Sequence, residues 1–323
     1  MSLDEKNPSL DIKNELRQHG VAFGGIDDLE IFVPEVNRTR LPDTGASREL
    51  SIPFSVVDDE PQLLMPFDNM SDVTRGAIVS CINAYFTAVE SRSVSEPTYD
   101  DFISFLEEHD DDSSQLRTDN DITSRTWSAV MRRVDRSEYS AVFDAGGAPF
   151  TEMTDAMFRP GRVTVIPTSH IRGKKEELVV LSLLSYIIEN KLTDYEVDSA
   201  VKGTPLLVAL DEAHTFLSEP SNTREQYIVS KARQAAKQGR KELLGLLAIT
   251  QNPDDIDDEI LKQINTNIFL QLRREVVQDV PSVPREFTNE IPKFAKGQAI
   301  VKAPDVEAVE VRGLPQCVTR HDN

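Results

Sequence analysis

The chain of 323 residues is long enough for one large domain or two of ordinary size, and 39% of its residues are hydrophobic, which is enough to fill a core. No apolar run approaches the ~20 residues that a membrane-spanning helix needs, and the first residues lack the apolar region of a secretory signal. These features predict a cytoplasmic protein with no membrane partner. The two cysteines, Cys81 and Cys317, have neither the spacing of a zinc site nor that of a disulfide framework.

The formal charge is -20, from 55 acidic and 35 basic residues. Affinity for nucleic acid comes largely from Lys and Arg, so this surplus argues against a phosphate-backbone partner. The acidic residues are spread along the whole chain, however, which is typical of a halophilic protein in concentrated salt, where charges are screened within a few ångströms. Under this interpretation the net charge does not exclude DNA.

Residues 1–62 are predicted to be a remnant of the amino-terminal half of an α/β core. An amphipathic helix is expected over 11–19, before Gly20, and a strand over 29–33, before Pro34. A second strand is expected over 50–57, in a polar segment that prolines interrupt. A strand so soon after a helix indicates that the sequence enters the core partway through.

Residues 63–160 are predicted to form a helical insert. Apolar residues recur at spacings of three and four, which indicates three packed helices between Met70 and Glu138, with a charged loop over 110–121. Because no strand separates them, these helices form an all-α unit on an α/β body. It can serve as a lid, as a partner surface or simply as packing.

Residues 161–323 are predicted to form the carboxy-terminal half of the core. Strands and helices alternate here, which is the pattern of a right-handed parallel sheet. The expected strands are 162–167, 206–210, 243–249 and 267–272, the expected helices are 174–191 and 256–263, and a β ribbon over 297–302 and 306–311 closes the chain.

Polar residues follow two of these apolar strands. Asp211 and Glu212 come directly after the first strand, and Thr250 and Gln251 after the second. The carboxyl ends of parallel strands meet at one edge of a sheet, where an aspartate can hold Mg²⁺ through its water shell and a glutamate can polarise an attacking water. The alternative is that these residues only cap helices or form turns.

Arg240 lies in a Gln-Gly-Arg-Lys turn before the second strand. Its guanidinium is suited to stabilise charge on a neighbouring subunit's nucleotide, and the alternative is a solvated basic turn. Together with the Asp-Glu and Thr-Gln pairs, the catalytic interpretation is favoured.

Three segments carry a family resemblance: LLVALDEAHTFL over 206–217, QGRKELLGLLAITQNP over 238–253, and NTNIFL over 265–270. In order and spacing they closely resemble the HerA-type ATPases of the HerA/FtsK superfamily. The resemblance is clear over about 161–272 and weak over 20–34.

The resemblance implies a RecA-like P-loop NTPase core with a mainly parallel sheet, interrupted by the all-α insert. It implies an ATP- and Mg²⁺-dependent DNA translocase or helicase that forms hexameric rings on double-stranded DNA and acts in DNA repair with a NurA-like nuclease. By position, Asp211 is the Mg²⁺ aspartate, Glu212 the catalytic glutamate, Gln251 the sensor and Arg240 the arginine that acts in trans, with Thr250 beside Gln251 as a nucleotide-binding residue.

One part of the family pattern is missing, namely the phosphate-binding loop G-x-x-x-x-G-K-[ST]. The Gly173-Lys174 pair has Thr168 in place of the first glycine and Lys175 in place of the hydroxyl residue. In the family this loop precedes the segment with which the sequence starts, so we predict loss from the N-terminus by truncation, a misplaced start or a split gene, rather than decay inside an intact domain. The isolated chain is then expected to hydrolyse ATP poorly or not at all.

Two other functions fit the same sequence. One is a non-catalytic ring or DNA-binding subunit that keeps the fold. The other is a conjugation-type pump ATPase that moves DNA or protein.

Overall fold

The computed structural model describes most of the chain, with short gaps. The described residues are 2–6, 14, 17–18, 26, 28–42, 47–65, 70–92, 97–195, 197–220, 223–280, 282–295, 297–313 and 319–320. The helix predicted over 11–19 lies almost entirely outside them. Within the described residues no helix is both long enough and apolar enough to cross a bilayer.

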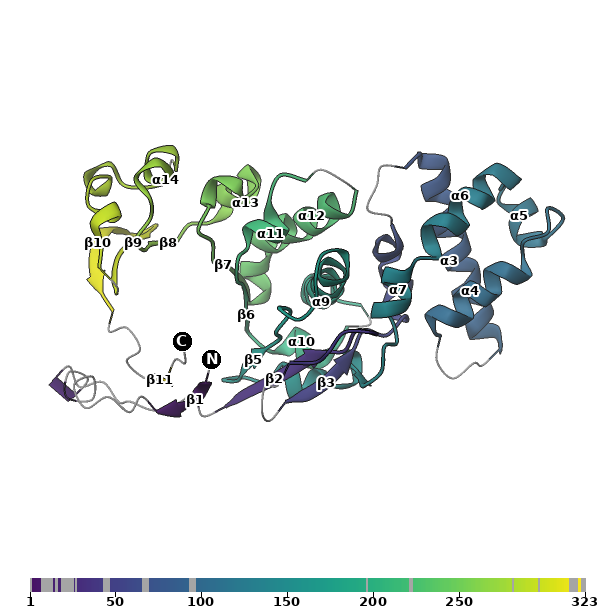
Figure 1. The fold of residues 1–323 in the computed structure, drawn as a ribbon, viewed down its shortest axis with the longest axis horizontal. Coiled ribbons are helices and arrows are strands. Elements are labelled where there is room, and N and C mark those ends of the chain that lie inside the picture. The colour runs from purple at the N-terminus through teal and green to yellow at the C-terminus, as the bar shows by residue number, and fades with distance from the viewer. Residues whose placement is uncertain are drawn as a thin grey trace.

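A four-stranded parallel sheet forms the base of the molecule in Figure 1. Its strand order is β4-β3-β2-β5, with every neighbouring pair parallel. The strands are β2 (Leu29–Pro34), β3 (Arg48–Ser51), β4 (Ala148–Pro149) and β5 (Val163–Val165). Strands β2 and β3 precede the helical insert and β5 follows it, so segments on both sides of the insert meet in one sheet.

Two further strands, β6 (Leu206–Leu210) and β7 (Leu244–Ala248), pair in parallel over their whole length. An antiparallel sheet of order β10-β9-β8 follows, from β8 (Asn267–Phe269), β9 (Gln298–Ala303) and β10 (Val306–Arg312). Strands β1 (Ser2–Lys6) and β11 (Thr319–Arg320) pair antiparallel. The mixed α/β fold with a parallel sheet, as predicted, is confirmed.

The body helices are α2 (Val56–Asp59), α8 (Thr154–Met157), α9 (Lys174–Leu192), α10 (Ser199–Gly203), α11 (His214–Leu217), α12 (Thr223–Gln238), α13 (Asp258–Gln263) and α14 (Arg274–Asp279). Short 3-10 turns join them: η1 (Pro61–Leu64), η2 (Phe150–Glu152), η3 (Gly239–Glu242), η4 (Pro253–Asp255), η5 (Arg285–Phe287) and η6 (Ile291–Lys293). Helix α12 packs on both α9 and β7.

Five helices make up the insert in the described residues, where three were predicted. They are α3 (Asp72–Arg92), α4 (Tyr99–Glu108), α5 (Gln115–Asp119), α6 (Ser124–Val134) and α7 (Ser137–Val142). Thr98 caps α4 and Thr123 caps α6 with their hydroxyl groups. The extra helix α5 lies in the predicted charged loop, because Arg117 is buried there and pairs with Asp112 and stacks on Trp127.

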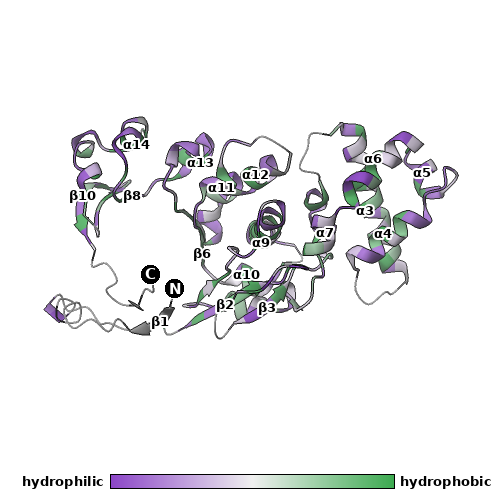
Figure 2. Ribbon diagram, in the orientation of Figure 1, coloured by the Kyte–Doolittle hydropathy of each residue, from purple (hydrophilic) through white to green (hydrophobic). Residues whose placement is uncertain are grey.

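The insert shares one hydrophobic core with the sheet. The ring of Phe54, which follows β3, contacts rings of α3, α4 and the end of α7; these are Tyr85, Phe86, Tyr99, Phe102 and Phe143. Figure 2 shows the insert helices with hydrophobic sides turned towards one another and polar sides outward. A separate small cluster, which includes Phe269, Val277, Ile291 and Ile300, stabilises the β8–β10 end.

Two boundaries differ from the prediction. The strand expected over 50–57 ends at Ser51 with one further bridge at Ile52, since Pro53 follows and the Val56 N–H donates to its carbonyl to start α2. The insert, predicted over 63–160, ends its helices at Val142, and β4 within that range pairs with β3.

Candidate active site

The polar residues after β6 and β7 lie side by side at one edge of the parallel pair. Two backbone hydrogen bonds continue the ladder past the strand ends: Ile249 N to Leu210 O at 3.0 Å, and Ala213 N to Ile249 O at 2.8 Å. They bring the Asp211-Glu212 turn against Thr250 and Gln251. The structure therefore brings together four of the five predicted site residues.

The carboxylate of Glu212 is held by side chains from both strands. Gln251 Nε2 donates to Glu212 Oε1 at 2.9 Å, and His214 Nδ1 lies 3.5 Å from Glu212 Oε2. The backbone of Glu212 has φ 46°, a left-handed conformation that is strained for a residue other than glycine. This strained turn aims a partly exposed carboxylate at the edge of the sheet, where a substrate water can reach it.

His214 is a member of this cluster that sequence reasoning missed. Its Nδ1 lies 3.2 Å from Thr250 Oγ1, so the imidazole bridges Glu212 and Thr250. The only sequence signal was its place two residues after the Asp-Glu pair. The partner lies 36 residues away, and only the parallel register of β6 and β7 makes the two meet.

Asp211 is exposed, and its Oδ1 accepts a hydrogen bond from the Glu212 N–H at 3.1 Å. No cluster of three or more His, Cys, Asp or Glu side chains suited to a metal ion occurs in the described part of the chain. Mg²⁺ in nucleotide sites usually takes one or two carboxylates, several waters and the substrate's phosphates. The oxygens of Asp211 and Thr250 fit such a sparse ligand set.

The loop from β5 to α9 resembles a phosphate-binding loop only in outline. It runs from a strand into a helix through Gly173, which has φ 60° at the helix N-cap. The Thr168 hydroxyl, however, donates to Glu176 at 2.8 Å, and Glu177 adds a second carboxylate to the first helical turn. Lys174 and Lys175 in the same turn balance these two carboxylates, so the turn has no net positive charge, and the Thr168 hydroxyl is already engaged by Glu176; the loop therefore lacks the features that hold ATP phosphates.

Arg240 lies at the opposite end of β7 from Gln251. The five residues of β7 put roughly 16 Å between the two at ~3.3 Å per residue. The turn is fixed: Lys202 Nζ pairs with Glu242 Oε2 at 3.0 Å, and Leu243 has φ 56°. Arg240 is exposed and has no hydrogen-bond or ion-pair partner among the described residues, so it cannot reach Glu212 of its own chain and projects outward.

Arg233 fixes the segment that leaves the site. Its Nε donates to Asp257 Oδ1 at 2.9 Å, and the guanidinium holds the pKa of Asp257 below its usual value. The same carboxylate caps α13 by accepting from the N–H groups of Glu259 and Ile260. The start of α13 is thereby tied to α12.

One face of the β6–β7 pair is bare. Leu207 is 68% exposed and is in register with Gly245, and Leu247 and Ile249 are exposed further along the same face of β7. Figure 1 shows α9, α11 and α12 together on one side of these strands. Parallel strands are normally covered on both faces, so the apolar surface formed by Leu207, Leu247 and Ile249, hereafter the bare face, is unusual.

No known family model matches the chain. The DNA double-strand break repair helicase HerA of Saccharolobus solfataricus is 23% identical over 197 residues, which is 59% of this chain and 38% of that protein. HerA of Sulfolobus acidocaldarius is 27% identical over 150 residues, which is 44% of this chain and 29% of the relative. The chain thus spans less than two fifths of these relatives.

Among solved structures, VirB4 of Thermoanaerobacter pseudethanolicus superimposes with a TM-score of 0.55 over 96% of this chain and 81% of that protein, at 11% identity. The bacterial conjugative coupling protein TrwB superimposes with a TM-score of 0.51 over 92% of this chain and 77% of its own, at 12% identity. At such identities these two show the shared fold. In sequence the chain is thus similar to HerA-type helicases of the HerA/FtsK superfamily, and it shares the mixed α/β fold of VirB4 and TrwB.

Proposed function

We propose that this chain is a portion of a HerA-like motor that couples ATP hydrolysis to movement on double-stranded DNA. The observation that carries the proposal is the Glu212 carboxylate, held by Gln251 beside Asp211 at the carboxyl end of two parallel strands. The similarity to HerA helicases supports DNA as the substrate on which the motor acts.

Each site residue has a proposed role. Asp211 holds Mg²⁺ through water, Glu212 takes the proton of the attacking water, and Thr250 and Gln251 sense the terminal phosphate. His214 orients Glu212 from the side. The distance of Arg240 from Gln251 supports its action on the nucleotide of a neighbouring subunit, as in a homo-hexameric ring.

The setting of this motor is also a proposal. We place it in the cytoplasm, in DNA repair with a NurA-like nuclease as partner. The charge of -20 supports a halophilic protein whose DNA contacts are made at high salt. The bare face supports packing of a strand and helix that bring the phosphate-binding loop to Asp211.

The test is a chimaera in which the phosphate-binding strand, loop and helix of a HerA-type ATPase are joined to this chain. At high salt with duplex DNA we expect ATP turnover on the order of 1 s⁻¹. Glu212→Gln should lower kcat by about 10²- to 10⁴-fold, because general-base catalysis is lost. The exposed Glu219→Gln is the matched control and should change little.

The chain without the added loop should show little or no turnover. The proposal fails if the chimaera assembles into rings, binds ATP and hydrolyses it at the same rate with Gln at position 212.

The role of Arg240 in trans has a sharper test. The Glu212→Gln and Arg240→Ala chimaeras should each be inactive alone. Mixed subunits should regain activity, since an intact Glu212 then meets an intact Arg240 across some interfaces. Mixed rings that stay inactive would contradict action between subunits.

A second candidate is a non-catalytic ring subunit, and the poor fit of the β5–α9 loop to phosphates favours it. It predicts that Asp211→Ala and Glu212→Ala leave every cellular phenotype unchanged. The fold shared with VirB4 and TrwB also fits a conjugation-type pump, which stimulation by single-stranded DNA or by a protein cargo, rather than by duplex DNA, would reveal.

A further inference from the structure

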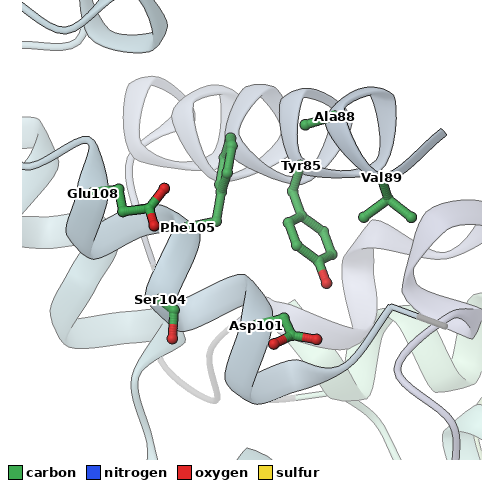
Figure 3. Close-up of a pocket in the computed structure, with 7 residues that line it drawn as sticks. All are labelled: Tyr85, Ala88, Val89, Asp101, Ser104, Phe105 and Glu108. Atoms are coloured by element: carbon green, nitrogen blue, oxygen red, sulfur yellow. The ribbon is translucent and has the colours of Figure 1, made fainter. Parts of the chain in front are cut away.

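The helical insert carries a groove that the proposed nucleotide chemistry does not use. It lies between α3 and α4 and has a volume of about 230 Å³. Figure 3 shows the rings of Tyr85 and Phe105 between the two helices, with Ala88 and Val89 above them on α3. This volume is below the ~300–1,000 Å³ of typical small-molecule pockets, which suits the groove to one apolar side chain.

The floor of the groove is rigid and apolar. Tyr85 and Phe105 are buried and meet edge to face with ring centroids 5.6 Å apart. The Tyr85 hydroxyl donates to the Thr98 carbonyl at 3.2 Å, which fixes the ring. Burial raises the pKa of Tyr85 to about 12, with a smaller contribution from Asp101, so the hydroxyl stays neutral at physiological pH.

The rim of the groove is acidic. Asp101, Ser104 and Glu108 stand one helical turn apart along the exposed side of α4, and neither carboxylate has a cationic partner among the described residues. Of the 20 residues from Pro97 to Leu116, seven are acidic and none is Lys or Arg. A molecule that binds in the groove must therefore present an apolar group to the floor and positive charge to the acidic rim.

Charge decides which occupant fits. DNA phosphates would be repelled by the rim, and the grooves of two copies of this chain, each with the same acidic rim, would repel one another. We propose that the α3–α4 groove docks a basic segment of a partner protein, with one aromatic or aliphatic side chain inserted between Tyr85 and Phe105 and flanking Lys or Arg residues paired with Asp101 and Glu108. Such an anchor with a charged surround is the usual anatomy of a small protein interface.

The probe for this site is a short synthetic peptide with a central Trp between Lys residues, labelled for fluorescence polarisation. The full chain should bind it. Peptides with Ser for Trp, or Glu for Lys, should bind at least tenfold more weakly. Equal binding of all three peptides would overturn the proposal.

Variants of the chain locate the binding. Ala88→Trp fills the groove from the half-buried side of α3 and should weaken binding at least tenfold. Asp101→Lys with Glu108→Lys should do the same by reversing the rim. The matched control is Glu307→Lys with Glu310→Lys, an equal charge change on exposed β10 residues, which should leave binding unchanged.

Circular dichroism of each variant establishes that it is folded, and rim reversal by itself leaves the apolar floor intact. Three results overturn the proposal: the control pair weakens the peptide as much as the rim pair, duplex DNA competes with the peptide for the groove, or Ala88→Trp abolishes self-association of the chain.

Discussion

Lys231 is a buried cation that joins three elements of the body. Its side chain is 7% exposed, and Nζ lies 2.6 Å from Glu60 Oε1 and also pairs with Glu189 of α9. Burial raises the pKa of Glu60, and the nearby Lys231 only partly offsets that shift. Removing Lys231 would leave a buried carboxylate without its counter-ion, which is among the costlier changes a core can suffer.

Lys231→Met should lower the free energy of unfolding at pH 7 by about 3–5 kcal/mol. Because the pKa of Glu60 is raised in the folded state, its protonated form is favoured by folding, and stability falls as pH rises through that pKa. The loss should therefore shrink when the pH is lowered towards the pKa of Glu60. Urea titrations at several pH values measure both effects.

The control for that experiment is Lys237→Met on the same helix. Lys237 is 48% exposed and pairs with Glu259 at the surface, so its loss should be within about 1 kcal/mol. If Lys231→Met lowers the free energy of unfolding no more than this control does, the ion pairs of Lys231 with Glu60 and Glu189 add no stability.

At the scale of elements, regular hydrophobic periodicity in the sequence predicted the bounds of the longer strands and helices correctly. Strands β2, β6 and β7 and helix α9 lie within two residues of their predicted bounds, because each carries an apolar run or a long repeated stripe. The strand predicted over 50–57 was wrong in its second half, because backbone turn formation after Pro53 competes with the apolar pattern. Short helices such as α5 depend on tertiary contacts and have no periodic signal.

The candidate site follows the same rule. That Asp211, Glu212, Thr250 and Gln251 share an edge could be predicted, since carboxyl ends of parallel strands coincide. The contact between His214 and Thr250 could not, because it depends on side-chain direction across two strands. The bare face could not be predicted from the sequence either, because an apolar strand has the same sequence pattern whether or not a neighbouring element covers it.

Substitutions at two glycines test whether the backbone around each one leaves room for a Cβ atom. A Cβ at Gly239 would lie 2.6 Å from the Leu244 carbonyl oxygen, whereas one at Gly76 in α3 would meet nothing within 4 Å. Gly239→Ala should therefore cost about 1–3 kcal/mol in unfolding free energy through a forced backbone shift. Gly76→Ala should stabilise the chain by about 0.5–1 kcal/mol through helix propensity.

Thermal and urea unfolding of the two variants give the comparison. Shifts of the same sign at both glycines would contradict the tight packing of η3 against β7. The Gly239 variant also reports on Arg240, since a displaced turn should weaken the mixed-ring activity proposed above.

At the scale of the whole molecule, the bare face is an apolar surface on a parallel strand pair that no other described element covers. Besides Leu207, Leu247 and Ile249, Ile268 on β8 is 60% exposed. Exposed apolar patches of this kind bind partners or drive association. The isolated chain is therefore expected to self-associate through β6 and β7 despite its strong net charge.

Leu207→Lys should reduce that self-association and change the unfolding free energy by no more than about 0.5 kcal/mol, because the side chain is already in solvent. Light scattering against concentration is the measurement. Val309→Lys adds the same charge at an exposed position on β10 and should have no such effect. Equal effects of both would assign the change to net charge rather than to the bare face.

The core that runs without a break from the sheet into the insert has a mechanical consequence. Phe54 lies three residues after the end of β3, and its ring packs against Tyr85 of the groove floor and against Phe102, which also contacts Tyr85. A partner that pulls on α4 would exert a force on these packed rings, and the rings would transmit that force to β3. The insert is therefore packed firmly on the sheet rather than hinged to it, and force applied to α4 is expected to be transmitted to β3.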